Sequence, residues 1–392
     1  MSVLPIYLDH TATARPWPDV IACLSSQLEL QYANPASLHR LGQSAAASLR
    51  QSRQQIAAAL GCSENELILT SGGSESINFA IKGAAAANPR LPKRIIISDG
   101  EHAAVTESAA YLRQLGWQTE ILPLLPNGQA DLLALEQALR EPAALISLIH
   151  VSNETGAVNP VDSIVSLRNR LQPAAIIHLD AVQSLGRQPV NFRSTGVDLL
   201  SGSGHKVGAP KGIGWLLVRQ GIRLTPLIHG GGQQGGLRSG TENPPLAAAL
   251  AFAINVALQD QAGKEQQVRQ LRRLLLDELQ NRGQPYQVLS PDDGVPQILC
   301  IAFPGLRGET LMQALAAREI CVSTGAACSA RRQKKNRILQ SMGIPVNLAE
   351  SSIRISLAAV NTEDEIRITA QAIHEIHRQL ARLPKIAAKP AR

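Results

Sequence analysis

Lys206 ends a segment in which an apolar run gives way to small residues, DLLSGSGHK at positions 198–206. A lysine delivered in this way lies close to backbone and away from bulk water, where a lowered ammonium pKa makes the amine nucleophilic. Such an amine can form a Schiff base with a carbonyl compound. The alternative is an ordinary surface lysine at a strand end. Which of the two interpretations holds depends on the other polar residues of the chain.

Three further polar groups follow predicted strands. Asp180 comes after the apolar strand around Ile177, and an unpaired buried carboxylate is so costly that it needs a cationic partner, unless it caps a helix. Residues 71–74, Ser-Gly-Gly-Ser, precede a predicted helix. Their free amides, their hydroxyls and the helix dipole form an anion cradle suited to a phosphate. His102 adds an aromatic face.

One cofactor uses all of these groups. Pyridoxal phosphate needs an anion site for its phosphate, a lysine for its aldehyde and an acid beside its pyridine nitrogen. Residues 71–74, Lys206 and Asp180 meet those needs, and His102 would cover the ring. A nicotinamide cofactor is excluded because no G-x-G-x-x-G follows the first strand.

The elements that must position these residues alternate along the chain. We predict helices at 103–115, 132–139 and 161–171, a helix capped by Ser37 that stops at Gly61, and another that starts at Glu75. This alternation indicates a mostly parallel sheet covered on both faces, with ligands beyond the carboxyl ends of its strands. The predicted strands are 66–70, 94–98, 118–122, 144–150, 175–179, 199–201 and 213–218.

The C-terminal part has a different pattern. A long helical stretch is expected from Pro244 to about Gly283, and the segments 298–303, 311–316, 321–324 and 353–356 then indicate a smaller α+β domain. We therefore expect a large cofactor-binding domain over 16–255. The expected small domain comprises 1–15 and 256–392.

The composition is that of an ordinary globular protein, with 44% hydrophobic and 18% charged residues. We expect no membrane segment and no secretory signal, and five cysteines without framework spacing favour a reducing compartment, the cytoplasm. The net charge of +7 is concentrated at 331–337 and in the tail 382–392. Because neither segment is a nucleic-acid-binding motif, we expect solvated basic faces and no direct nucleic-acid binding.

Seven motifs lie in order along nearly the whole chain. They are TSGGSES (70–76), EH (101–102), HVSNE (150–154), DAVQS (180–184), SGHK (203–206), GGGQ (230–233) with RSGT (238–241), and STGAAC (323–328). With these motifs the chain resembles the cysteine desulfurases, in the group with a long catalytic loop. The resemblance implies an α/β fold of fold-type I pyridoxal phosphate-dependent transferases, with a mostly parallel seven-stranded sheet flanked by helices and a smaller α+β domain.

The resemblance also implies roles for single residues around the cofactor. Lys206 forms the Schiff base, Asp180 pairs with the pyridine nitrogen, and Gln183 bonds the ring hydroxyl. His102 stacks on the ring and moves protons. Thr241 reaches the phosphate of the other subunit, which implies a homodimer with shared active sites. The remaining cofactor-binding residues are Gly73, Ser74, Asn153, Ser203 and His205.

The substrate side is implied in the same way. Asn34, Asn153 and Arg354 would hold the carboxylate of L-cysteine, and a guanidinium meets a carboxylate with two parallel bonds. Cys328 would take the sulfur as a persulfide and leave L-alanine. Basic residues 331–335 follow Cys328 and favour its reactive thiolate. The other cysteines are expected to be structural.

Partners follow from this chemistry. The persulfide would pass to a sulfur-acceptor protein, either an iron–sulfur scaffold or a thiolation protein, with Cys328 as a donor to a nascent cluster. No metal site is expected. Two alternatives stay open: another fold-type I enzyme, such as an aminotransferase or β-lyase, and a non-catalytic pyridoxal-binding scaffold. The chain also departs from the family, with Gly73-Ser74 where Ala-Thr is usual and with a more basic loop after Cys328.

Overall fold

The computed structural model describes residues 5–324 and 336–381, and the chain divides into two compact units. The large unit comprises residues 11–153 and 157–261. The small unit comprises residues 1–10, 154–156 and 262–392. Among the described residues, no helix combines the length and the apolar character needed to cross a membrane.

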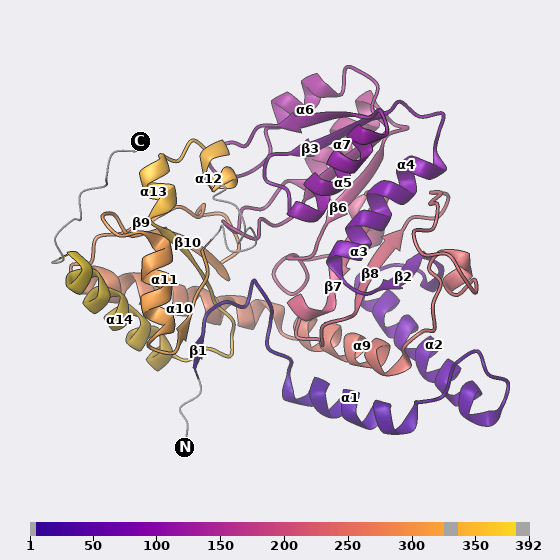
Figure 1. Cartoon of the computed structure of the whole chain (residues 1–392), viewed down its shortest axis with the longest axis horizontal. Coiled ribbons are helices and arrows are strands. Elements are labelled where there is room, and N and C mark those ends of the chain that lie inside the picture. The colour runs from indigo at the N-terminus through magenta and orange to yellow at the C-terminus, as the bar shows by residue number, and fades with distance from the viewer. Residues whose placement is uncertain (1–4, 325–335, 382–392) are drawn as a thin grey trace, which may run out of the picture. The chain divides into compact units, whose positions relative to one another are not determined.

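The large unit is built on a seven-stranded sheet, as predicted (Figure 1). Its order is β2-β8-β7-β6-β5-β3-β4, and every neighbouring pair is parallel except those made by β8. The predicted strands all form, two of them with the predicted bounds. They are β2 (Leu67–Thr70), β3 (Arg94–Ser98), β4 (Gln118–Leu122), β5 (Leu145–Ile149), β6 (Ile176–Asp180), β7 (Leu199–Ser203) and β8 (Gly214–Val218).

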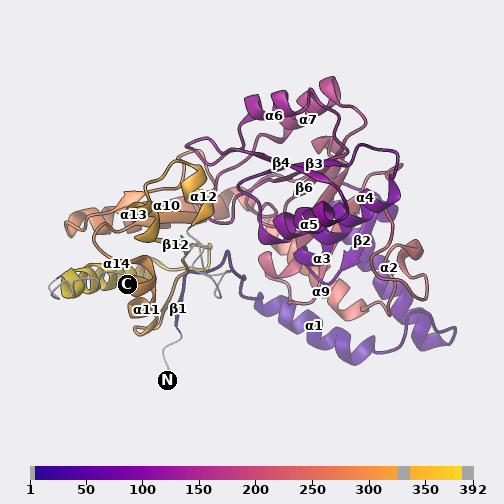
Figure 2. The ribbon, with the colours of Figure 1, turned by 45° about the horizontal axis from the view of Figure 1, so that its top comes forward.

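Helices cover both faces of this sheet because its strands carry apolar residues on both sides. Along β5, Ile146 packs into one core cluster and its neighbour Leu145 into the other, as the two-residue period of a strand requires. One cluster includes α1 (Pro18–Leu30), α2 (Arg40–Leu60), α6 (Leu132–Ala138), α7 (Val161–Leu171) and α9 (Pro244–Leu258). The other includes α3 (Gly73–Asn78), α4 (Ala84–Ala87) and α5 (Ala103–Gln114) (Figure 2).

The sheet directions bring several strand ends to one side. Strands β3, β5, β6 and β7 are parallel, and β2 runs with β7 because both are antiparallel to β8. Their carboxyl ends therefore share one edge of the sheet. In such sheets this edge is where ligands bind.

The small unit is an α+β structure, as predicted. Its antiparallel sheet consists of β12 (Ser352–Ser356), β10 (Ile298–Ala302) and β9 (Gln287–Val288), and β1 (Ile6–Tyr7) pairs in parallel with β11 (Ile320–Cys321). Leucines and isoleucines of the sheet and helices form its core. The helices are α10 (Gln261–Asn281, from residue 262 on in this unit), α11 (Gly308–Ala316), α12 (Arg337–Ser341), α13 (Val346–Glu350) and α14 (Glu363–Ala381).

Three predicted helix features are wrong. The helix assigned to a Ser37 cap begins at Arg40, where His39 accepts a hydrogen bond from Gly42 N. The helix expected from Glu75 begins at Gly73. The long helical stretch is broken between α9 and α10, where Asp260 has a positive φ of 48° that no continuous helix allows.

Candidate active site

Lys206 lies in the short 3-10 turn η3 (Gly204–Lys206), directly after β7. Its Nζ donates hydrogen bonds to the carbonyl oxygens of Thr11 at 2.7 Å and Ala12 at 2.8 Å. The residue is half-buried. The amine is therefore held against backbone at the carboxyl edge of the sheet.

His205 is held by Thr13 and Ala14, the residues that follow Thr11 and Ala12. Its Nδ1 lies 3.1 Å from Thr13 Oγ1, and its carbonyl oxygen accepts a hydrogen bond from Ala14 N at 2.8 Å. Burial, helped by the charges of Lys206 and Lys211, lowers the pKa of His205 to about 4. The imidazole is therefore neutral at pH 7 and can accept a proton or a hydrogen bond.

Asp180 ends β6 and is buried. Burial raises the pKa of its carboxyl, whereas His102, the Val182 N–H and Lys206 act in the opposite direction. Its Oδ1 accepts a hydrogen bond from Val182 N at 3.0 Å. The structure thus brings Asp180, His102 and Lys206 within electrostatic reach of one another.

Gln183, one turn further on, is also buried. Its Nε2 donates to Thr11 O at 3.1 Å, the same carbonyl that Lys206 uses, and its Oε1 accepts from Arg187 Nη1 at 2.7 Å. The amide plane is thereby fixed. One N–H of Nε2 remains for a further acceptor.

The turn at residues 71–74 lies beside the end of β7. Gly72 has φ 152° and ψ −177°, and a Cβ built on it would lie 3.7 Å from Ser203 Oγ. A Cβ built on Gly214 would come within 2.6 Å of Gly72 Cα, so strand β8 also approaches this turn closely. The turn, the start of α3 and the hydroxyl of Ser203 therefore surround one small region.

His102 caps helix α5. Its Nδ1 accepts a hydrogen bond from Ala104 N at 3.1 Å, so a neutral His102 carries its proton on Nε2. Glu101 beside it is buried, and its Oε1 accepts hydrogen bonds from Ser98 Oγ at 2.5 Å and Ile149 N at 3.0 Å. Burial raises the pKa of Glu101 to about 8.

Asn34 and Thr241, predicted for different roles, line one cavity of about 560 Å³ in the large unit. Both are exposed, and Asn34 Oδ1 accepts a hydrogen bond from Ala36 N at 2.9 Å. Asn153 lies just beyond the bridge between Val151 and Val158 and is half-buried. Ser74 is exposed in the first turn of α3.

Arg354 lies on β12 of the small unit. Its side chain is only 7% exposed, and its Nη2 donates to Asp9 Oδ1 at 2.8 Å. Its backbone exchanges hydrogen bonds with Ser323, at 2.7 and 3.1 Å. Burial raises the pKa of nearby Glu154 to about 7, against the lowering effect of Arg354 and Arg337. Arg354 is thus a buried cation with carboxyl groups close to it.

The predicted nucleophile Cys328 lies outside the described residues, as do the basic positions 331–335 and the tail 382–392. Among the described residues, the free cysteines are Cys23, Cys62, Cys300 and Cys321. Burial raises the pKa of the thiols of both Cys62 and Cys300 to about 12. Those two thiols therefore stay protonated and unreactive at neutral pH.

Residues 6–368 match the family model described as "Aminotransferase class-V". A cysteine desulfurase IscS of Serratia proteamaculans is 39% identical over 95% of this chain and 92% of its own length, and one of Dictyoglomus turgidum is 34% identical over 96% and 95%. The chain belongs to the class-V aminotransferase family, among the cysteine desulfurases. A solved structure described as a NifS-like protein superposes with a TM-score of 0.90, at 33% identity, over 96% of this chain and all of that one.

Class-V aminotransferases use pyridoxal phosphate, and the residues of the large unit fit that cofactor. The hydroxyl of Ser203 is buried, and no described residue hydrogen-bonds it. It lies beside glycines 72 and 73 at the start of α3, where the free N–H groups of a helix N-terminus can bind a phosphate. Asp180 and Lys206 supply the acid and the amine that the cofactor also needs.

Several residues that contact the candidate site residues of each unit were not predicted from the sequence. Thr11 serves both Lys206 and Gln183, and Asp9 binds Arg354. Glu101 contacts the strand that pairs with β6. For Thr11, the only local signal in the sequence was the run of small residues 11–14 after a short strand.

Proposed function

We propose that this chain acts on L-cysteine, releases L-alanine and carries the sulfur as a persulfide on Cys328. The observation that carries the proposal is the match to cysteine desulfurases over almost the full chain, together with the placement of Lys206, Asp180 and His102 at one sheet edge. A neighbouring structure, described as SspA in complex with cysteine, supports the choice of substrate (TM-score 0.78, 29% identity, covering 91% of this chain).

The large unit would hold the cofactor through the residues described above. Pyridoxal phosphate, when bound, supplies an aldehyde for the substrate amino group and a ring that withdraws electrons from the substrate Cα. Asp180 would hold the proton of the pyridine nitrogen. Lys206 would bind the aldehyde through Nζ and, once displaced, take the Cα proton on the same atom. Ser203, Ser74 and the Gly73 N–H would bind the phosphate, with His205.

The substrate carboxylate would pair with Arg354, helped by Asn34 and Asn153. The thiolate of Cys328 would then attack the sulfur of the substrate. The S–S bond forms as the substrate Cβ–S bond breaks, and the electron pair of that bond stays on carbon. A proton delivered to Cβ and the return of a proton from Lys206 Nζ to Cα complete alanine. His102, whose neutral ring carries its proton on Nε2, is the proposed carrier for protons near the substrate.

The test compares the wild type with Cys328→Ser, using Cys23→Ser as a matched control because Cys23 is a half-buried thiol of the large unit. Each protein is given L-cysteine, and alanine and protein-bound sulfane sulfur are measured. The control should match the wild type, and Cys328→Ser should lose both products. Normal alanine formation by Cys328→Ser would contradict the proposal, and release of pyruvate and sulfide in place of alanine would point to a β-lyase.

We further propose a homodimer in which Thr241 reaches the phosphate of the partner. Support comes from the exposure of Thr241 and of the apolar side chains of Leu227 and Ile228, which belong to the same connection between β8 and α9. Light scattering coupled to size-exclusion chromatography gives the mass directly. A monomer at micromolar concentration would overturn this part of the proposal.

The proposed sulfur acceptor is an iron–sulfur scaffold or a thiolation protein, and the proposed compartment is the cytoplasm. The free cysteines of the described part are compatible with a reducing environment. Incubation of the persulfide-loaded protein with candidate acceptors, followed by mass spectrometry of the acceptor, tests the transfer.

A further inference from the structure

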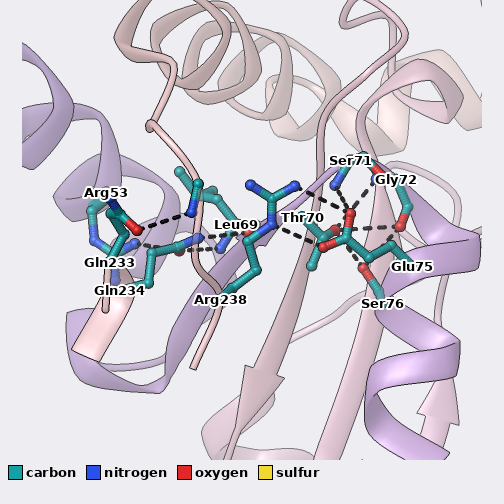
Figure 3. A network of polar contacts seen from close by, with 11 residues as sticks. Arg53, Leu69, Thr70, Ser71, Gly72, Glu75, Ser76, Gln233, Gln234 and Arg238 are labelled. Carbon is teal, nitrogen blue, oxygen red and sulfur yellow. Dashed lines mark hydrogen bonds and ion pairs between the residues drawn. The ribbon is translucent and has the colours of Figure 1, made fainter. Parts of the chain in front are cut away.

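The connection between β8 and α9 carries Thr241, and the amide of Gln234 binds it to strand β2 (Figure 3). Gln234 Oε1 accepts a hydrogen bond from Leu69 N at 2.7 Å, and Gln234 Nε2 donates to Leu69 O at 2.8 Å. Arg53 Nη1 also donates to Gln234 Oε1 at 3.2 Å, and its Nη2 donates to Leu67 O at 2.7 Å. The amide thus makes the two-bond contact that a neighbouring strand would make.

The backbone of Gln234 supports a specific role for this side chain. Gln234 has φ 52°, in the left-handed region that glycine prefers, although glycines stand at 235 and 236. Such a conformation costs a non-glycine residue free energy and persists only where its surroundings impose it. Here the two hydrogen bonds to Leu69 compensate for that cost.

A second contact joins the same connection to the phosphate turn. Arg238 Nε donates to Glu75 Oε1 at 3.0 Å, and both side chains are mostly buried, at 23% and 14% exposure. Glu75 Oε2 accepts a hydrogen bond from Ser71 N at 2.7 Å, the residue that opens the turn (Figure 3). One carboxylate therefore binds both the turn and the segment that leads to Thr241.

The electrostatics of Glu75 agree with this geometry. Burial alone would raise the pKa of its carboxyl, but the hydrogen bonds from Arg238 and Ser71 outweigh burial and the pKa is lowered. The carboxylate is therefore charged at neutral pH, and so is Arg238. A charged pair with little solvent around it holds its geometry better than an exposed one.

We propose that Glu75, Arg238 and Gln234 are positioning residues that fix the two phosphate-binding parts of the protein, the turn at 71–74 and the Thr241 segment, to one another. This inference rests on the proposed cofactor and on the proposed role of Thr241. Its consequence is specific: the three residues contribute to recognition of the phosphate and leave recognition of the pyridine ring unchanged.

The experiment measures how tightly the cofactor-free protein binds pyridoxal phosphate and, separately, pyridoxal, which lacks the phosphate. The variants are Glu75→Gln, Arg238→Gln, their double variant and Gln234→Glu, which keeps the shape but places an acceptor opposite the carbonyl of Leu69. Arg170→Gln is the control, because it removes an exposed ion pair with Glu136 in the same unit.

We expect each of the three single variants to bind pyridoxal phosphate about tenfold more weakly, with pyridoxal affinity changed less than about twofold. The double variant should resemble the singles, because both remove one interaction. The control should keep both affinities. Equal weakening for both ligands, or no weakening of pyridoxal phosphate binding, would overturn the inference.

Two outcomes separate this inference from the proposed function. A wild type that binds neither ligand overturns both. A wild type that prefers pyridoxal phosphate, with variants that keep the full preference, overturns the inference alone. Because Glu75→Gln and Gln234→Glu are close in shape to the wild type and probe separate contacts, loss of folding in one leaves the other to decide.

Discussion

Arg354 donates a hydrogen bond to Asp9 at 2.8 Å, and the guanidinium is almost fully buried. The two residues are 345 positions apart, yet both belong to the small unit. A buried cation without a counter-charge is costly, so the hydrogen-bonded carboxylate of Asp9 stabilises Arg354 at this position. Asp9 also limits the directions in which the guanidinium can face any further carboxylate.

Asp9→Asn should therefore lower the free energy of unfolding by about 2 kcal/mol, since the acceptor oxygen remains but the charge is lost. The KM for L-cysteine should also rise if Arg354 binds its carboxylate. Urea unfolding and steady-state kinetics measure the two effects. Glu265→Gln, which removes an exposed pair with Arg269, is the control and should cost less than about 1 kcal/mol. Equal losses for the two variants would contradict this account.

His178 should make the protein sensitive to acid. It is buried between Ser147 Oγ and Ser201 Oγ, each 2.8 Å from a ring nitrogen, and burial lowers its pKa to about 3. The unfolded chain takes up a proton below about pH 6.5 and the folded protein does not, so stability is full above that pH and falls towards pH 3 by up to about 1.4 kcal/mol per unit.

The corresponding variant is His178→Gln, studied by urea unfolding between pH 7 and pH 4. Its stability should be lower at pH 7 but should depend less on pH than that of the wild type. His229→Gln, at an exposed position, should keep the wild-type slope. An unchanged slope in His178→Gln would assign the acid sensitivity to other groups.

Glu101 should have the opposite effect to His178 on the pH dependence of stability. Burial raises its pKa to about 8, so between about pH 4.5 and 8 the folded protein holds a proton that the unfolded chain releases. Stability from this group is therefore lost as the pH rises through that window. Glu101→Gln should remove this loss in the cofactor-free protein, whereas exposed Glu107→Gln should not. Thermal unfolding at pH 5, 6, 7 and 8 measures the difference.

The effect of enlarging Gly73 should depend on the size of the side chain at position 182. A Cβ on Gly73 would lie 2.8 Å from Val182 Cγ2, and a valine side chain has few ways to turn aside. Gly73→Ala should weaken pyridoxal phosphate binding about tenfold by displacing the turn. The double variant Gly73→Ala with Val182→Ala should recover most of the affinity, and fluorescence titration measures it. Tight binding by Gly73→Ala alone would show that Val182 moves easily.

The sheet could be predicted from the sequence because its strands are short apolar runs with clear ends, such as residues 94–98 and 118–122. The placement of Asp180, His102 and Lys206 at one edge of the sheet could be predicted because each comes at or just after the end of such a strand. The cap of α2 could not, because a turn at Asn34 delays the helix beyond Ser37. Nor could the break at Asp260, since the apolar faces on either side continue the helical period.

Contacts between distant segments were beyond the sequence altogether. The run of small residues around Thr11 marks a turn but does not indicate that Thr11 meets Lys206, 195 positions away. The same holds for Gln234 and Leu69, whose pairing depends on how a long connection returns to the sheet. The local pattern specifies elements, and the packed fold alone specifies these partners.

Strand β2 is the last strand on its side of the sheet, so its outward backbone groups could recruit a strand from another molecule. The side chains of Gln234 and Arg53 occupy those groups at Leu69 and Leu67. In the described part of the chain, these two polar side chains occupy hydrogen-bonding groups to which another strand would have to pair, and so they oppose edge-to-edge association at β2.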